Sequence, residues 1–319
     1  MSEMEFIKAY KEKINELIRN ENIQEYAIIK CGFSKDDNFY RDCIKHYKNR
    51  QIDPNWKFTE WFLPKDLKEK VILLKIVFQL KKHFISSDDD IYYPKENPIC
   101  KDKGFKIPMM RASSWKGALR YVAMRYILEG NNNEKIKRRL IMLKLFGTEK
   151  DSIEEFLNRK FRENNLLEKW KKEVKKLRKR LNVKELHLRG RLIFFPTFFN
   201  QINLDVIAPH DRKTKTVKNP ILIEIVPENT RGEFYLLYYP FNLIEKLFSD
   251  KKEVALKEIK EDFDMLIEII PNMFEVYGFG AKTSSGYGIA KIEKIYVNNK
   301  DVNKNWDKVL EVVENEYKK

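Results

Sequence analysis

Two segments far apart in the sequence combine glycine, serine and lysine, residue types that hold phosphate groups. The first spans residues 278–288 and reads GFGAKTSSGYG. Glycine lets a backbone approach a ligand closely, and exposed N–H groups beside a lysine can bind phosphate oxygens. The segment is not a Walker loop, because no Gly-Lys-Ser/Thr opens a helix here. A flexible hairpin is the alternative. The candidate phosphate-binding residues are Gly278, Gly280, Lys282, Ser284, Ser285, Gly286 and Gly288.

The second segment is a predicted helix start at residues 108–120, which reads PMMRASSWKGALR. Ser113 and Ser114 are expected to cap the helix, and free N–H groups at a helix start bind anions. Lys116 lies in the first turn, and Arg120 follows four residues later near the same face. All four residues are candidates for phosphate contact, and an ordinary N-cap explains the two serines equally well.

Carboxylates gather in the long predicted loop at residues 81–108. Asp88, Asp89 and Asp90 are adjacent, so they either bind Mg²⁺ through oxygen ligands or form a solvated turn. His83 can shuttle a proton, although a lone histidine at a strand end is also typical of a structural role. No histidine pair has metal-ligand spacing, and no Ser-His-Asp order is present.

The overall charge of the chain indicates a polyanionic partner. Its 319 residues carry a formal net charge of +15, and nucleic acid is the leading candidate for such a basic chain. The apolar runs are too short to span a bilayer, and the polar start is not that of a signal peptide. Three widely spaced cysteines (Cys31, Cys43 and Cys100) indicate free thiols in a reducing cytoplasm.

Hydrophobic periodicity predicts the elements that must position these residues. Strands are expected at residues 71–80, 188–199, 221–226, 233–239 and 289–297, and helices at 3–20, 115–127, 134–145, 170–181 and 256–274. The third and fourth strands are expected to pair with each other, and the basic stretch 205–220 suits an exposed hairpin. Setting one strand aside as part of that hairpin leaves the order βαββαβ. The predicted fold class is therefore α+β, with a ferredoxin-like (RRM-like) core.

The predicted organisation has one central domain with additions. Residues 1–70 form an N-terminal helical extension, and residues 71–299 form the ferredoxin-like domain. A helical insertion is expected at about 148–185 and a finger hairpin at about 203–220. Residues 300–319 form a C-terminal helix.

The motifs resemble those of the RAMP superfamily, the repeat-associated mysterious proteins of CRISPR systems. The family's Pro-x-x-x-Gly-Ser-Ser-Leu-Lys-Gly-x-x-Arg is similar to PMMRASSWKGALR here, with Ala112 in place of the glycine. Leu145-Phe146-Gly147 and the C-terminal GFGAKTSSGYG follow in the family's order. The resemblance covers roughly residues 71–297.

This resemblance implies a backbone-type subunit of a type III CRISPR effector complex in antiviral defence. Such a subunit binds crRNA and target RNA and contacts other effector subunits, and its partners include no membrane. It is expected in the cytoplasm. The finger hairpin, with His210 and Lys213, is the candidate for kinking the guide–target duplex.

The resemblance also raises an enzymatic alternative, a divalent-metal-dependent endoribonuclease that cuts target RNA. In backbone subunits an aspartate in the loop after the first strand performs this reaction. The matching position here holds Glu96, and Ser86-Ser87 replace the family's Gly-Gly. The candidate catalytic residues are Glu96, Asp88 and Asp90, and Mg²⁺ is the only cofactor implied. A metal-independent crRNA-processing nuclease with His83 as base, and an interaction protein without an RNA role, are further alternatives.

Overall fold

The computed structural model describes residues 70–87, 98–102, 107–148, 152–181, 187–207 and 221–318. Several predictions fall outside these residues. They are the N-terminal extension with its helix at 3–20, the carboxylates Asp88, Asp90 and Glu96, and the finger residues His210 and Lys213.

A five-stranded antiparallel sheet organises the molecule, with the strand order β3-β7-β1-β8-β9. The strands are β1 (Ile72–Leu80), β3 (Leu192–Phe194), β7 (Arg231–Tyr238), β8 (Ala290–Val297) and β9 (Lys300–Asp301). Alternate side chains of β1, from Ile72 to Leu80, are buried, and those between them are half-buried. This period of two, with many β-branched residues, suits a strand at the centre of a sheet.

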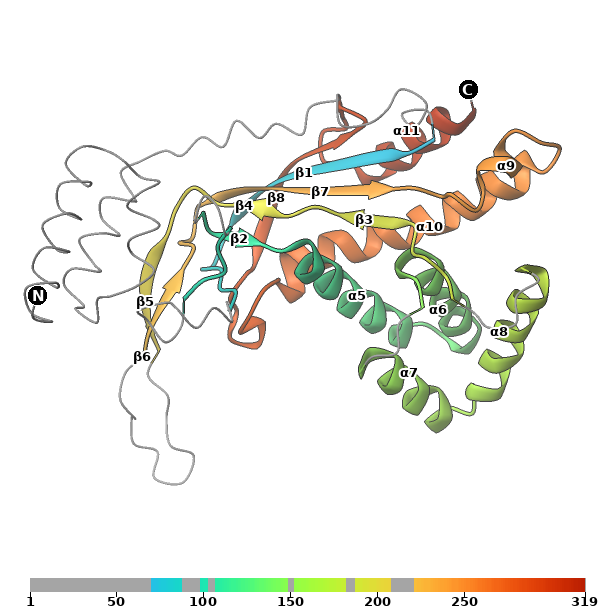
Figure 1. The fold of residues 1–319 in the computed structure, drawn as a ribbon, viewed down its shortest axis with the longest axis horizontal. Helices are drawn as coiled ribbons and strands as arrows, with labels where there is room; N and C mark the ends of the chain where they lie inside the picture. The colour runs from blue at the N-terminus through green and yellow to red at the C-terminus, as the bar shows by residue number, and fades with distance from the viewer. Residues whose placement is uncertain are drawn as a thin grey trace, which may run out of the picture.

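Helices cover one face of this sheet (Figure 1). They are α5 (Ala112–Glu129), α6 (Asn132–Phe146) and α10 (Lys252–Asn272), with α11 (Trp306–Lys318) packed on α10 and β8. Trp115, Leu119 and Ile127 of α5 are buried, as their helical spacing predicts. Asn131 and Glu134 form a capping box that starts α6. The short helix α9 (Ile244–Leu247) precedes α10.

Two additions project from this layer pair (Figure 1). Helices α7 (Ser152–Glu163) and α8 (Leu167–Leu181) follow α6, at the position of the predicted helical insertion. Strands β5 (Asn203–Ile207) and β6 (Ile221–Ile225) form an antiparallel pair, which is the base of the predicted hairpin. Strand β2 (Met109–Met110), which directly precedes α5 in the sequence, pairs with β4 (Thr197–Phe198) in a second two-stranded sheet.

The predicted pairing of the strands at 221–226 and 233–239 is wrong. Strand β6 pairs with β5, whereas β7 pairs with β1 and β3. Strand β7 begins at the exposed Arg231, and its last five residues, from Phe234 to Tyr238, are all buried. In the large sheet β7 has a neighbouring strand at both edges, β1 and β3, so its backbone groups are hydrogen-bonded on both sides. Val226 leaves β6 and bridges to Phe84 instead.

The predicted strand at 188–199 is divided. Its first part, β3, joins the large sheet, and its second part, β4, pairs with β2. Pro196 lies between the two parts and has no N–H to donate, so a continuous ladder cannot pass through it. Near the other end of the chain, α10 continues through Pro271 and widens into the π-helical turn η2 (Met273–Tyr277).

A buried ionic network joins the start of β3 to α10. Arg191 donates hydrogen bonds to Asp262 and Glu258, each at 2.5 Å, and the Tyr238 hydroxyl donates to Asp262 at 2.7 Å. Burial alone would raise the pKa of Glu258, but the charges of Arg191 and Lys144 lower it to about 2.

No helix among the described residues has both the length and the apolar character that crossing a bilayer requires.

Candidate nucleic-acid interface

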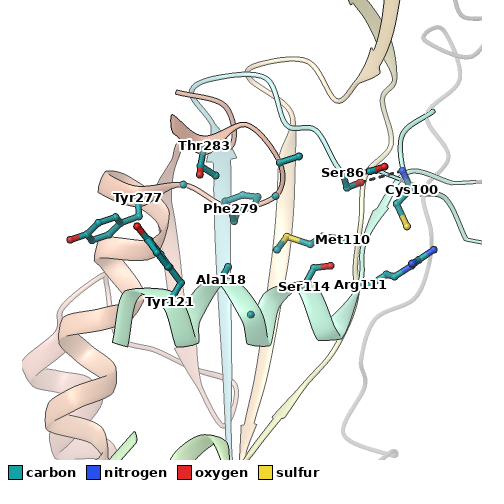
Figure 2. A pocket seen from close by; sticks show the side chains of 15 residues that line it. Ser86, Cys100, Met110, Arg111, Ser114, Ala118, Tyr121, Tyr277, Phe279 and Thr283 are labelled. Atoms are coloured by element: carbon teal, nitrogen blue, oxygen red, sulfur yellow. Dashed lines mark hydrogen bonds between the residues drawn. The ribbon is translucent and has the colours of Figure 1, made fainter. Parts of the chain in front are cut away.

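The two motif segments meet at one cavity of about 400 Å³. Helix α5 contributes Ser114, Gly117, Ala118 and Tyr121 to its lining, and Arg111 directly before the helix also lines it. The glycine segment contributes the residues from Tyr277 to Ala281 together with Thr283, and Ser86, Ser87, Cys100 and Met110 complete it. Figure 2 shows the glycine segment above α5, with Tyr121 and Tyr277 at one end of the cavity and Ser86 and Cys100 at the other.

Aromatic packing beneath the cavity holds the two segments together. The ring of Trp115, one residue after Ser114, lies 4.6 Å from the ring of Phe279 between their centroids. Both side chains are almost fully buried. The Trp115 indole N–H donates to the Thr197 hydroxyl at 3.0 Å, so its orientation is determined by a polar contact as well.

The start of α5 presents backbone N–H groups without a side-chain cap. Arg111 is the N-cap residue and makes no capping hydrogen bond. The prediction that Ser113 and Ser114 cap the helix is therefore wrong, because both residues lie inside its first turn. They are exposed, and the first turn contains no acidic residue. The positive end of the helix dipole is thus uncompensated in that turn, which favours an anion.

Three glycines of the C-terminal segment are required by protein packing. Gly278, Gly280 and Gly288 have φ values of 72°, 89° and 73°. A Cβ atom on Gly280 would lie 2.4 Å from the Ile85 carbonyl oxygen, and one on Gly288 would lie 1.9 Å from the Phe279 carbonyl oxygen. The backbone therefore approaches other backbone closely at these positions, and Gly278 and Gly280 also line the cavity.

Gly286 differs from these three because its surroundings are open. Its φ is 85°, and no atom of the described residues lies within 4 Å of the position that a Cβ atom would take. Lys282, with φ 57°, begins the short 3-10 turn η3 (Thr283–Ser285) and is exposed, as are Ser284 and Ser285. Residues 282–286 are thus the part of the segment that faces solvent and can receive a ligand.

The cavity also contains residues that the motif analysis missed. Gly117 lines it, and no other described residue comes within 4 Å of where its Cβ atom would lie. Tyr121 is 45% exposed, and its ring meets the ring of Tyr277 edge to face, with 6.0 Å between centroids. Helical spacing offered one signal, because Ser114, Gly117 and Tyr121 share a helix face. For Tyr277, which follows the long helix, the sequence contains no comparable signal.

Lys116 and Arg120 lie on a different face of α5. They are one turn apart, as expected, but neither lines the cavity beside the glycine segment. Arg120 is only 4% exposed and lines a second cavity together with Arg139. The structure therefore brings Ser114 to the glycine segment and separates Arg120 from it.

The hairpin base is attached to the glycine segment and to residues 98–102. The Tyr287 hydroxyl donates to the Asp205 carboxylate at 2.8 Å, and burial together with this bond raises the pKa of Tyr287 to about 12. Glu224 of β6 forms a buried ion pair with Lys101 at 2.6 Å and accepts a hydrogen bond from the Ile99 N–H. The β5–β6 pair therefore lies beside segments that line the cavity.

Among the described residues, no group of three or more histidine, cysteine, aspartate or glutamate side chains can hold a metal ion. The Nδ1 atom of His83 accepts a hydrogen bond from the Glu228 N–H at 3.0 Å, which gives this histidine a structural partner. Cys100 is buried and forms no disulfide with another described residue.

Comparison with known proteins agrees with the motifs. A family model described as "RAMPs: RAMP superfamily" matches residues 84–291. No curated protein matches the chain. A chain from a structure described as "Type III-B Cmr-beta bound to cognate target RNA" shares the fold, with a TM-score of 0.53 and 16% identity. The match covers 89% of this chain and 96% of that one. A chain of a "CRISPR RNA-guided surveillance complex" aligns at 13% identity and a TM-score of 0.39, over 71% of this chain and 68% of that one.

Proposed function

Because this chain belongs to the RAMP superfamily, we propose that it is an RNA-binding subunit of a type III CRISPR effector complex. The fold that it shares with a chain of the Cmr-beta complex supports this assignment. In such a complex the chain contacts crRNA, target RNA and neighbouring effector subunits. The net charge of +15 suits these polyanionic partners.

The core is proposed to be a ferredoxin-like βαββαβ unit, made of β1, α5, β3, β7, α10 and β8. The strand order β3-β7-β1-β8 and the antiparallel neighbours support this assignment. In this arrangement α6, α7 and α8 are inserted after the first helix, and the β5–β6 hairpin is inserted between the second and third strands. The RNA-recognition motif uses the same frame, so the proposed core agrees with the proposed ligand.

The convergence of Ser114 and Gly280 on one cavity is the observation that carries the proposed RNA-binding role. RNA phosphates would lie against the uncapped N–H groups of α5 and near the exposed Lys282 side chain. An unstacked base can rest on Tyr121, whose ring is accessible at the same cavity. Contacts of this kind read the backbone, so binding is expected to depend little on RNA sequence.

Charge reversal at the cavity tests this role. We expect Ser114→Glu and Lys282→Glu each to weaken binding of a fluorescently labelled single-stranded RNA about tenfold, measured by anisotropy at several salt concentrations. Lys282→Glu should also reduce the salt slope by about 1, since one phosphate contact is lost. A glutamate in the first turn of α5 interacts favourably with the helix dipole, so lost binding in Ser114→Glu cannot come from a weakened helix.

The matched control is Lys308→Glu, which makes the same charge change as Lys282→Glu at an exposed position on α11. Equal losses in Lys308→Glu and Lys282→Glu would show that only net charge matters and would contradict a site at the cavity.

A second candidate function is metal-dependent RNA cleavage by the loop carboxylates. One observation favours it: the described residues on both sides of residues 88–97 meet at the cavity. Ser87 bridges to Ile99, and the Cys100 N–H donates to the Ser86 carbonyl oxygen at 3.1 Å. Ser86, Ser87 and Cys100 also line the cavity.

Cleavage of bound target RNA in the presence of Mg²⁺ would support this second function if Glu96→Gln removes the activity and leaves RNA affinity unchanged. The same assay on Asp88→Asn and Asp90→Asn would show whether either aspartate takes part. Cleavage that continues in all three variants would eliminate these carboxylates as catalytic groups.

A further inference from the structure

A second cavity, of about 460 Å³, lies among α5, α6, α7, α8 and residues 147–148 and 187. Its lining shares no residue with the cavity beside the glycine segment. The lining combines two arginines with an apolar wall. That wall is made of Met142, Leu143, Trp170 and Val174.

Arg139 is the central cation of this cavity and is only 2% exposed. Its Nη2 donates to Glu154 at 2.6 Å and to Asn158 at 2.7 Å. The guanidinium carbon lies 4.5 Å from the centre of the Phe161 ring and 4.2 Å from that of the Trp170 ring. The aromatic contacts thus stabilise the cation, and its position is held by α7 and α8.

Two nitrogens of Arg139, Nε and Nη1, have no hydrogen-bond acceptor among the described residues. A buried donor without an acceptor costs about 1–3 kcal/mol, so native structures rarely retain one unless a ligand or water completes it. The side chain borders the cavity, which is where such an acceptor can enter.

The charges around the cavity favour an anionic acceptor. Arg120 supplies a second buried cation, and Glu154 is the one carboxylate in the lining, which also contains His187. On α8, the exposed side chains of Lys172 and Lys175 add positive charge, whereas Lys171 is paired with Glu168. An anion that approaches therefore meets an excess of positive charge.

We propose that this cavity binds a nucleoside phosphate, with the phosphate near Arg139 and Arg120 and the base against the apolar wall. The volume lies within the range of about 300–1,000 Å³ that small-molecule sites occupy. Trp170 and Val174 offer the apolar surface that a base requires, and a simple inorganic anion would leave that surface unused. A free nucleotide and the terminal nucleotide of an RNA present the same chemistry, so both are sources of this ligand.

Equilibrium dialysis of the full chain tests the proposal with AMP, adenosine and inorganic phosphate. We expect AMP to bind at least tenfold more tightly than either of its parts. A short RNA with a 5′-phosphate, compared with the same RNA with a 5′-hydroxyl, distinguishes a bound RNA end from a free nucleotide. Preference for the phosphorylated end would identify the RNA terminus as the source, and binding of AMP alone would identify the free nucleotide.

Val174→Glu places a carboxylate in the cavity and should weaken AMP binding at least tenfold. Lys308→Gln makes the same change in net charge at an exposed position on α11, a helix that contributes nothing to this cavity's lining, and should leave binding unchanged. Circular dichroism checks that both variants fold. The proposal is overturned if neither AMP nor RNA binds, if phosphate alone binds as tightly as AMP, or if Val174→Glu binds normally. Tighter binding of a glutamate-rich peptide than of AMP would also overturn it and indicate a protein partner.

Discussion

The ring of Trp115 packs against the ring of Phe279, with 4.6 Å between their centroids. One ring belongs to the helix start and the other to the glycine segment, so a single buried contact joins motifs that are more than 150 residues apart in the sequence. Phe78 of β1 and Phe274 of η2 touch the same two rings. The cavity that is proposed to bind RNA is therefore supported directly by the hydrophobic core, and damage to the core should alter it.

Replacing Trp115 should destabilise the whole fold. Trp115→Ala removes a fully buried ring and should lower the free energy of unfolding by about 3–5 kcal/mol, measured in urea. Trp115→Phe keeps most of the apolar contact but loses the hydrogen bond to Thr197, so a cost of about 1–2 kcal/mol is expected. Trp306→Ala, on the half-buried start of α11, is the control. If Trp115→Ala costs no more than this control, the proposed support of the cavity is wrong.

Replacing Gly288 by alanine should destabilise the protein much more than replacing Gly286 by alanine. Gly288→Ala should destabilise by about 4 kcal/mol or more, because its Cβ atom would overlap the Phe279 carbonyl oxygen. In Gly286→Ala the new Cβ atom meets no neighbour within the described parts of the chain, so the variant should cost only the strain of a positive φ, about 1–2 kcal/mol. Thermal unfolding monitored by circular dichroism compares them. Similar losses in the two variants would contradict the packing described here.

Removing the Tyr121 ring should weaken RNA binding without affecting stability greatly. Stacking of a base on an aromatic side chain contributes about 1–3 kcal/mol, so Tyr121→Ala should raise the Kd for single-stranded RNA about five- to tenfold or more. Phe248→Ala removes another exposed ring, 73% accessible, that lies away from the cavity, and should bind RNA normally. Fluorescence anisotropy measures both. Unchanged affinity in Tyr121→Ala would remove the base-stacking role.

The Glu258 carboxylate should make the free energy of unfolding depend on pH. Its pKa of about 2 lies below the ordinary value of 4.5, because Arg191 and Lys144 favour the charged form despite burial. The stabilisation is therefore complete above about pH 4.5 and is lost as the pH falls through 2. The advantage of the wild type over Glu258→Gln in urea unfolding should be about 2 kcal/mol smaller at pH 3 than at pH 6. An advantage that does not change with pH would contradict this account.

The type and approximate place of most described elements could be predicted from the sequence, because hydrophobic periodicity is a local property. The alternation in β1 and the spacing of Trp115, Leu119 and Ile127 in α5 are both visible in single segments. The family motifs likewise lie in short stretches, and they included Ser114 and Gly280, which line the cavity.

Only the tertiary structure decided which partners those elements meet. The pairing of β6 with β5, the burial of Arg120 in a second cavity and the meeting of Tyr121 with Tyr277 all depend on contacts between distant parts of the chain. A residue pattern indicates that a strand must pair with another strand and that an apolar helix face must be buried. It does not indicate which segment of the chain pairs with the strand or buries the helix face. The physical reason is that burial and strand pairing are shared between segments, whereas propensity and periodicity belong to one segment at a time.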